Sequence, residues 1–203
     1  REPGPVGVLG MRWERFHPDS WSAGLTLGQV FRERSDPSFS ASSGLSGLTS
    51  EMLVAAHYSA AWGGSIQARG LFDDQFEPIK AEARFAYARN KLSLSGTYVQ
   101  LKADPSENRT SSVAEWSLAS TYRVNKHWTA TANVQYDLLT DRFARQGAKV
   151  QYLNECISVG LGATRSFARS TTLVPATTYE LSVSLLGFST GGSGKAARRT
   201  CRK

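Results

Sequence analysis

Cysteine and histidine are the residues from which a metal site or a reactive thiol could be built, and this sequence contains few of them. Cys156 and Cys201 do not have the spacing of metal ligands. The three histidines are scattered along the chain, at His17, His57 and His127. We therefore expect no metal site, and disulfide formation is the chemistry that remains open to the two cysteines.

Motifs of familiar enzyme classes do not occur in the sequence. It contains no G-x-S-x-G elbow, no P-loop, no H-E-x-x-H pair and no dinucleotide-binding fingerprint. The adjacent carboxylates Asp73 and Asp74 could serve acid–base chemistry or bind calcium, but a place on the rim of a loop explains them more simply. We expect a protein that is not an enzyme and that needs no cofactor.

The net charge of +7 is concentrated near the C-terminus. Segment 189–203 carries five basic residues and no acidic one. A short basic segment of this kind is usually solvated and disordered. It could suit nucleic acid, but no basic helix or aromatic stacking platform accompanies it, so we expect no nucleic-acid partner.

Alternation of apolar and polar residues is the dominant pattern in the chain. Between residues 128 and 138, apolar side chains from Trp128 to Leu138 occupy every second position, and Thr, Asn, Gln and Asp occupy the positions between them. Because a strand sends alternate side chains to opposite faces, this segment has one apolar and one polar face. The same pattern predicts strands at 79–89, 92–102, 114–122, 157–167 and 179–185, with weaker versions at 21–34, 52–62, 65–73 and 146–153 and a further strand near 5–15.

Three features favour a membrane barrel over a soluble β-sandwich. Most predicted strands run for about ten to twelve residues, whereas soluble strands usually stop near 5–6 and about 9–11 tilted residues cross a bilayer. Aromatic residues lie near the ends of the apolar face, and the polar face is nearly free of large hydrophobic residues. We therefore predict an all-β fold: an antiparallel transmembrane β-barrel segment of about 10–11 strands over residues 1–188, part of a larger barrel, with a basic periplasmic tail at 189–203. Since the chain starts at Arg1 and its first residues already have a strand pattern, we expect a fragment of a longer protein.

The links between the predicted strands indicate an orientation. In each successive pair of links, from 16–20 and 35–50 to 153–156 and 168–177, the first is the shorter. Bacterial barrels have short periplasmic turns and longer extracellular loops. The short links, including the turn that contains Cys156, and the tail that contains Cys201 are then periplasmic. In that oxidising compartment the two cysteines can join each other or cysteines elsewhere in the protein.

Charges of both signs lie on the predicted polar face, and His57 faces the same side. These charges suit a hydrophilic passage, but they could instead pair with one another or hold an internal plug. They include Arg69, Lys80, Arg84 and Lys149 on the basic side, and Glu82, Glu115 and Glu180 on the acidic side.

The chain resembles the C-terminal part of the LptD family of lipopolysaccharide-assembly proteins. The likeness is carried by Gly28–Arg32 with Ser43–Leu45 and Ser50–Glu51, by Asn154–Cys156 with Thr164–Phe167, and by Pro175–Thr178 leading into a strand over 179–188. That last strand also resembles the terminal strand by which barrels are recognised for assembly. The resemblance implies a very large barrel in the cell outer membrane, plugged by an LptE-like lipoprotein.

The resemblance also implies partners and roles for particular residues. Lipopolysaccharide would pass from a periplasmic Lpt bridge through an N-terminal periplasmic domain and the barrel wall into outer-membrane lipid. In the family, cysteines in this late turn bond to the N-terminal domain and usually form an adjacent pair; here Cys156 stands at that site, and Cys201 could serve as the second. The family gate lies between the first and last strands, so the last strand would form one side of it, with Tyr179, Leu181, Val183, Leu185 and Phe188 as gate-strand residues.

Three functions follow as hypotheses. The first is transport and assembly of lipopolysaccharide at the outer membrane. The second is a porin-like passive channel, and the third is a barrel enzyme. The sequence of the protein upstream of this chain separates the first two, because a periplasmic domain with cysteines supports the translocon.

Overall fold

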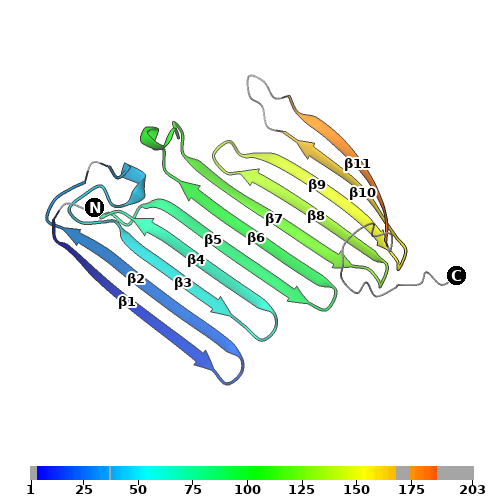
Figure 1. The fold of residues 1–203 in the computed structure, drawn as a ribbon, viewed down its shortest axis with the longest axis horizontal. Helices are drawn as coiled ribbons and strands as arrows, with labels where there is room; N and C mark the ends of the chain where they lie inside the picture. Colours follow the sequence, from blue (N-terminus) through cyan, green and yellow to red (C-terminus); the bar gives the residue numbers. More distant parts are fainter. Residues whose placement is uncertain (1–3, 37, 168–173, 187–203) are drawn as a thin grey trace, which may run out of the picture.

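Eleven antiparallel strands make up a single sheet in a computed structural model that describes residues 4–36, 38–167 and 174–186 (Figure 1). Each strand pairs with the next along the chain, so the topology is an up-and-down meander. The strands are β1 (Val6–His17), β2 (Trp21–Arg32), β3 (Met52–Ser59), β4 (Gly64–Phe72), β5 (Pro78–Arg89), β6 (Leu92–Leu101), β7 (Val113–Arg123), β8 (Trp128–Asp137), β9 (Arg142–Leu153), β10 (Ile157–Ser166) and β11 (Ala176–Leu185). All eleven predicted strands are present, although β9 begins four residues earlier than its pattern suggested.

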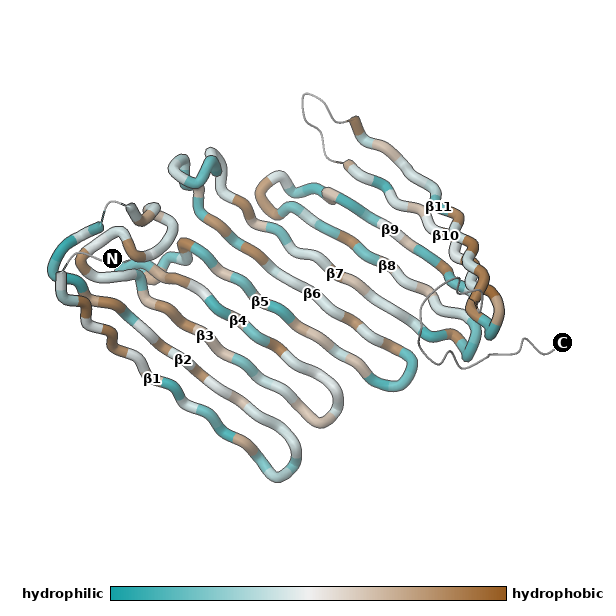
Figure 2. Tube along the Cα trace, viewed as in Figure 1, coloured by the Kyte–Doolittle hydropathy of each residue, from teal (hydrophilic) through white to brown (hydrophobic). Residues whose placement is uncertain are grey.

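The sheet has two faces, and cross-strand pairing extends each of them from strand to strand. Residues that pair directly lie on the same face. Thr131 of β8 pairs with Lys149 of β9 on the polar face, and Ala132 pairs with Ala148 on the apolar face. Figure 2 shows the resulting alternation of hydrophobic and hydrophilic residues along the strands.

The described residues form one layer with almost no core of their own. Ile79 and Ala114 are the only apolar residues buried among them. Large apolar side chains are instead exposed, for example Leu161 at 62% and Leu181 at 70%. A soluble sandwich would bury such residues between two sheets, so this part of the chain is not a sandwich.

The sheet is open, with β1 and β11 as its edges within the described part of the chain. Figure 1 shows it as a curved, twisted surface with short turns at one end of the strands and longer loops at the other. No helix in the described ranges is long and apolar enough to cross a membrane.

The alternation of short and long links holds in four of the five predicted pairs. The exception is the fourth pair, where the links 124–127 and 138–141 both contain four residues. The prediction of a longer link at 139–146 was wrong, because residues 142–145 belong to β9. A register shift at Gln135/Tyr136 in the β8–β9 ladder had interrupted the alternation there.

Large hydrophobic residues do occur on the polar face at the long-loop end, contrary to expectation. Leu53 pairs with Leu71 there, and Leu101 pairs with Lys80. The loop 33–51 packs against Leu71, since a Cβ on Gly44 would lie 3.1 Å from Leu71 Cδ1. Leu71 therefore contacts a loop that folds onto the polar face.

Candidate functional site

A polar hollow of about 340 Å³ lies on the polar face between β2 and β5. Its lining includes Thr26, His57, Gln67, Arg69, Glu82 and Arg84. His57 pairs with Gly24, and its imidazole occupies the space that a side chain at position 24 would need. The placement of His57 on the polar face is thus confirmed, and Gly24 is what makes room for its ring.

The charges in this hollow are joined to one another. Glu82 accepts hydrogen bonds of 3.0 and 2.6 Å from the guanidinium of Arg69, and its other carboxylate oxygen contacts Arg84 Nε. Two arginines share one carboxylate, so the cluster has a net positive charge. Of the alternatives open at the sequence level, mutual pairing holds for these three residues.

A second polar hollow of about 440 Å³ lies on the same face at the other end of the sheet, between β8 and β11. It is lined by Thr131, Asn133, Arg145, Lys149, Thr164 and Glu180, among others. Lys149 Nζ lies 3.2 Å from Glu180 Oε1. Hydroxyl, amide and charged groups therefore line the polar face at both ends of the sheet.

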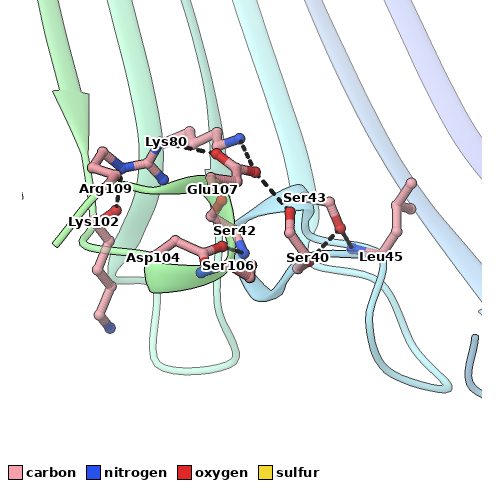
Figure 3. A network of polar contacts seen from close by, with 10 residues as sticks. All are labelled: Ser40, Ser42, Ser43, Leu45, Lys80, Lys102, Asp104, Ser106, Glu107 and Arg109. Atoms are coloured by element: carbon pink, nitrogen blue, oxygen red, sulfur yellow. Dashed lines mark hydrogen bonds and ion pairs between the residues drawn. The ribbon is translucent and has the colours of Figure 1, made fainter. Parts of the chain in front are cut away.

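Two loops at the long-loop end are tied together by a network of polar contacts (Figure 3). The backbone N–H of Ser42 donates to Asp104 Oδ2 at 2.8 Å, and the hydroxyl of Ser40 donates to Glu107 Oε1 at 2.6 Å. Lys80, on the polar face of β5, reaches the same Glu107 oxygen at 3.4 Å. The loops 33–51 and 102–112 therefore meet over the polar face.

Asp104 is the centre of this network because it also caps a short 3₁₀ turn. Its Oδ1 accepts hydrogen bonds from the backbone N–H and the hydroxyl of Ser106, with Pro105 in the first position of the turn. These bonds, and the one from Ser42, hold the pKa of the Asp104 carboxyl well below its usual range. The hydroxyl of Ser40 and the guanidinium of Arg109 lower the pKa of Glu107 from 4.5 to about 2.

Glu51 precedes β3, and Asp73 and Asp74 follow β4. Asp73 Oδ1 accepts backbone hydrogen bonds from Gln75 and Glu77 and so shapes the link 73–77. Partial burial, together with Asp73 and Asp74, raises the pKa of Glu51. No group of three His, Cys, Asp or Glu side chains suited to a metal ion occurs within the described residues.

Cys156 lies in the turn between β9 and β10, as predicted. The Asn154 side chain accepts hydrogen bonds from the backbone N–H groups of Cys156 and Ile157 at 2.9 and 2.8 Å, which fixes the turn. Leu186, just beyond β11, donates its N–H to the Cys156 carbonyl at 2.7 Å. Cys201 lies outside the described residues, so the pairing of these cysteines stays a prediction.

The predicted gate strand is the edge strand β11. Four of its residues, Tyr179, Leu181, Val183 and Leu185, lie opposite Ala163, Leu161, Val159 and Ile157 of β10 on the apolar face. All four are well exposed. Phe188 lies outside the described residues.

Aromatic side chains gather on the apolar face at the short-turn end. Three neighbouring pairs have ring centroids 5.1–6.2 Å apart: Trp21 with Tyr58, Trp62 with Tyr87, and Trp128 with Tyr152. Each of these residues lies within a few positions of a strand end. This row matches the predicted aromatic ends of the strands.

Several of these polar contacts were not predicted from the sequence. Ser42 and Asp104 are separated by 62 positions, and no local pattern links them. Only the Asp-Pro-Ser sequence at 104–106 carried a signal, since Asp before Pro often begins a turn. Lys149 and Glu180 were placed on the polar face, but their contact depends on the register of three strands.

One protein-family model, described as "LptD: LPS transport system D", matches residues 7–113. The match runs from β1 to the first residue of β7 and covers more than half of the 203 residues. It includes the first of the three stretches that carry the resemblance; the other two lie beyond it. No curated protein matches the chain.

Proposed function

The chain belongs to the LptD family of LPS transport proteins, and on that premise we propose that its sheet is part of an outer-membrane barrel that delivers lipopolysaccharide to the outer leaflet. The family is one of transport and assembly proteins, not of enzymes. Its match over residues 7–113 is the observation that carries the proposal.

A membrane position is supported by the single-layered sheet. Leu161, Leu181 and similar side chains have no partner layer in the described structure, and lipid is an environment that would cover them. Strands of eight to twelve residues match the about 9–11 tilted residues that span a bilayer. The row of Trp and Tyr at the short-turn end suits an interface between lipid and water.

We further propose that the polar face lines the interior of the barrel. The two polar hollows offer hydroxyl, amide and charged groups to the sugars and phosphates of a passing lipopolysaccharide, or to an LptE-like lipoprotein plug. The loops 33–51 and 102–112 then lie at the extracellular mouth, and the short turns face the periplasm. This orientation puts Cys156 on the side of the N-terminal periplasmic domain and the Lpt bridge.

The two open edges support the proposal of a larger barrel. Edge strands present unpaired backbone groups, which cannot remain unpaired in lipid. Further strands of the protein would pair with β1, and the first strand of the barrel would meet β11 to form the gate. Tyr179, Leu181, Val183, Leu185 and Phe188 would then lie on one side of the gate.

The cysteines complete the proposal. We propose that Cys156 forms a disulfide in the periplasm. Its partner is Cys201 or a cysteine of the N-terminal domain. The hydrogen bond between Leu186 and Cys156 supports Cys201 as the partner, because it places Leu186, the last described residue of the chain, beside this turn.

Depletion of the full-length protein in living cells tests the function. New lipopolysaccharide should fail to reach the outer leaflet and should accumulate on the periplasmic side, as measured by its modification by an enzyme restricted to the outer leaflet. If lipopolysaccharide delivery continued while uptake of small hydrophilic solutes fell, the protein would be a passive channel and the proposal would be wrong.

A further inference from the structure

Lys149 and Glu180 form an ion pair between two strands that are not neighbours. Lys149 is on β9 and Glu180 is on β11, with β10 between them. The register places Lys149, Gly162 and Glu180 in one row on the polar face. Two strand spacings separate the two backbones by about 10 Å, yet Nζ and Oε1 are 3.2 Å apart. The lysine side chain therefore crosses the whole width of β10.

Two glycines of β10 leave the path open for this side chain. A Cβ on Gly160 would lie 3.0 Å from Lys149 Cε and 2.6 Å from Ser182 Oγ. A Cβ on Gly162 would lie 3.6 Å from Lys149 Cβ and Cγ, which is ordinary contact. Glycine inside a strand weakens it and often marks a close approach. Here the close approach is that of the lysine stem, which lies over β10 and passes nearest to Gly160.

Among the described residues, β11 has few other side-chain contacts on this face. It is an edge strand in which all but one of the ten residues are exposed, and it pairs with β10 alone within the described sheet. Ser182 adds one long hydrogen bond, of 3.5 Å, to the Gly160 carbonyl. The contact with Lys149 reaches past β10 and joins β11 to a strand in the interior of the sheet.

We propose that Lys149 is a positioning residue that clamps β11 to β9 across β10. With this clamp in place, the sheet opens on the free side of β11 and not along the β10–β11 ladder. The inference rests on the proposed function, in which β11 is a gate strand. The new element is the contact that holds the closed side of that strand.

Hydrogen exchange of backbone amides in the purified full-length protein, embedded in lipid nanodiscs, tests the clamp. Lys149→Gln and Glu180→Gln should each speed exchange in β11 by up to about fivefold, the range expected for an exposed ion pair. Lys149→Arg should keep the exchange slow, and the exchanged pair Lys149→Glu with Glu180→Lys should restore it. Unchanged exchange in both Gln variants would overturn the proposal.

The two glycines provide a matched control. Gly160→Ala, made together with Ser182→Ala to remove the hydroxyl that would lie 2.6 Å from the new methyl group, should displace the lysine stem. Compared with Ser182→Ala alone, it should speed exchange in β11 as Lys149→Gln does. Gly162→Ala should leave exchange unchanged, because its methyl group has room. Glu82→Gln, which breaks the ion pair of the adjacent strands β4 and β5, should not affect β11 either. If Gly162→Ala or Glu82→Gln sped exchange in β11 as much as Lys149→Gln does, the cause would be a general loss of sheet stability. The clamp would then be excluded.

This measurement separates the clamp from the proposed function. Exchange is recorded without lipopolysaccharide, so its outcome does not depend on transport. If exchange in β11 were slow in every variant, the clamp would be excluded and the transport proposal would be unaffected. The depletion experiment measures lipopolysaccharide delivery in cells. Its outcome is therefore independent of the exchange rates measured on the purified protein.

Discussion

The backbone N–H of Ser42 donates a 2.8 Å hydrogen bond to the carboxylate of Asp104, 62 residues further along the chain and on a different loop. Both residues are almost fully buried, at 2% and 3% exposure. The bond joins loops that leave the sheet at β2 and β6, so it fixes how they lie over the polar face. A buried N–H that loses its acceptor is costly, which makes this contact a sensitive point of the loop network.

Asp104→Asn should separate the two loops. The new amide keeps one oxygen for Ser106 but turns an NH₂ group toward the N–H of Ser42, where two donors repel each other. We expect limited proteolysis to cut loop 33–51 several-fold faster in this variant. Asp36→Asn is the matched control, because Asp36 bonds to Ser38 within its own loop. Equal cleavage of the two variants would show that the contact between the loops is not what protects them.

Acid should release the same network. The folded-state pKa of Asp104 lies below its usual value, and that of Glu107 falls from 4.5 to about 2. A carboxyl with a lowered folded pKa stabilises the folded loops above its unfolded pKa, and this contribution is lost as the pH falls through the folded value. Protection of loop 33–51 from hydrogen exchange should therefore not fall between neutral pH and about 5, where protonation of Glu51 with its raised pKa acts in the opposite direction. It should decline toward about 2, after correction for the intrinsic pH dependence of exchange. Glu107→Gln should flatten this decline, and a loss of protection already complete at pH 5 would contradict the assignment.

Gly96 should resist substitution because Phe85 covers it. The two residues pair directly on β5 and β6, and a Cβ at position 96 would overlap the Phe85 ring. Gly96→Ala should lower the free energy of unfolding by about 1–3 kcal/mol, the usual cost of overpacking. Gly28→Ala is the control, since its nearest neighbour would be 3.9 Å away. Urea titration in lipid vesicles gives both values, and adding Phe85→Ala should remove the extra cost at position 96.

The cysteines should reveal their pairing on non-reducing gels of the full-length protein. Cys156→Ser should change the migration of the oxidised protein, because it removes the proposed periplasmic disulfide. Cys201→Ser should cause the same change if the two cysteines pair with each other, and none if Cys156 pairs with the N-terminal domain. Unchanged migration of Cys156→Ser would show that this residue forms no such bond.

The strands could be predicted from the sequence because every second residue reports the face of the sheet. Segment 128–138 shows this most clearly, and β8 occupies Trp128–Asp137. The start of β9 was missed because the register shift beside Tyr136 breaks the alternation over 142–145. Local pattern thus finds strands wherever the pairing is regular.

Contacts between distant segments could not be predicted in this way. Leu71 lies on the polar face, where loop 33–51 packs against it, and no local pattern predicts this contact. The contact of Lys149 with Glu180 requires the registers of two ladders and the two glycines between them. Such contacts depend on three-dimensional register, which no single stretch of sequence contains.

We propose that this sheet stands in the outer membrane with its apolar face in lipid and its polar face toward the interior of a barrel. The most direct test places a spin label at successive positions of β8 from Thr129 to Val134 in the full-length protein in lipid vesicles. Collisions with oxygen, which concentrates in lipid, are compared with collisions with a water-soluble nickel complex. We expect strict alternation, with lipid contact at Ala130, Ala132 and Val134 and water contact at Thr129, Thr131 and Asn133. Equal access of the nickel complex to both sets would contradict it.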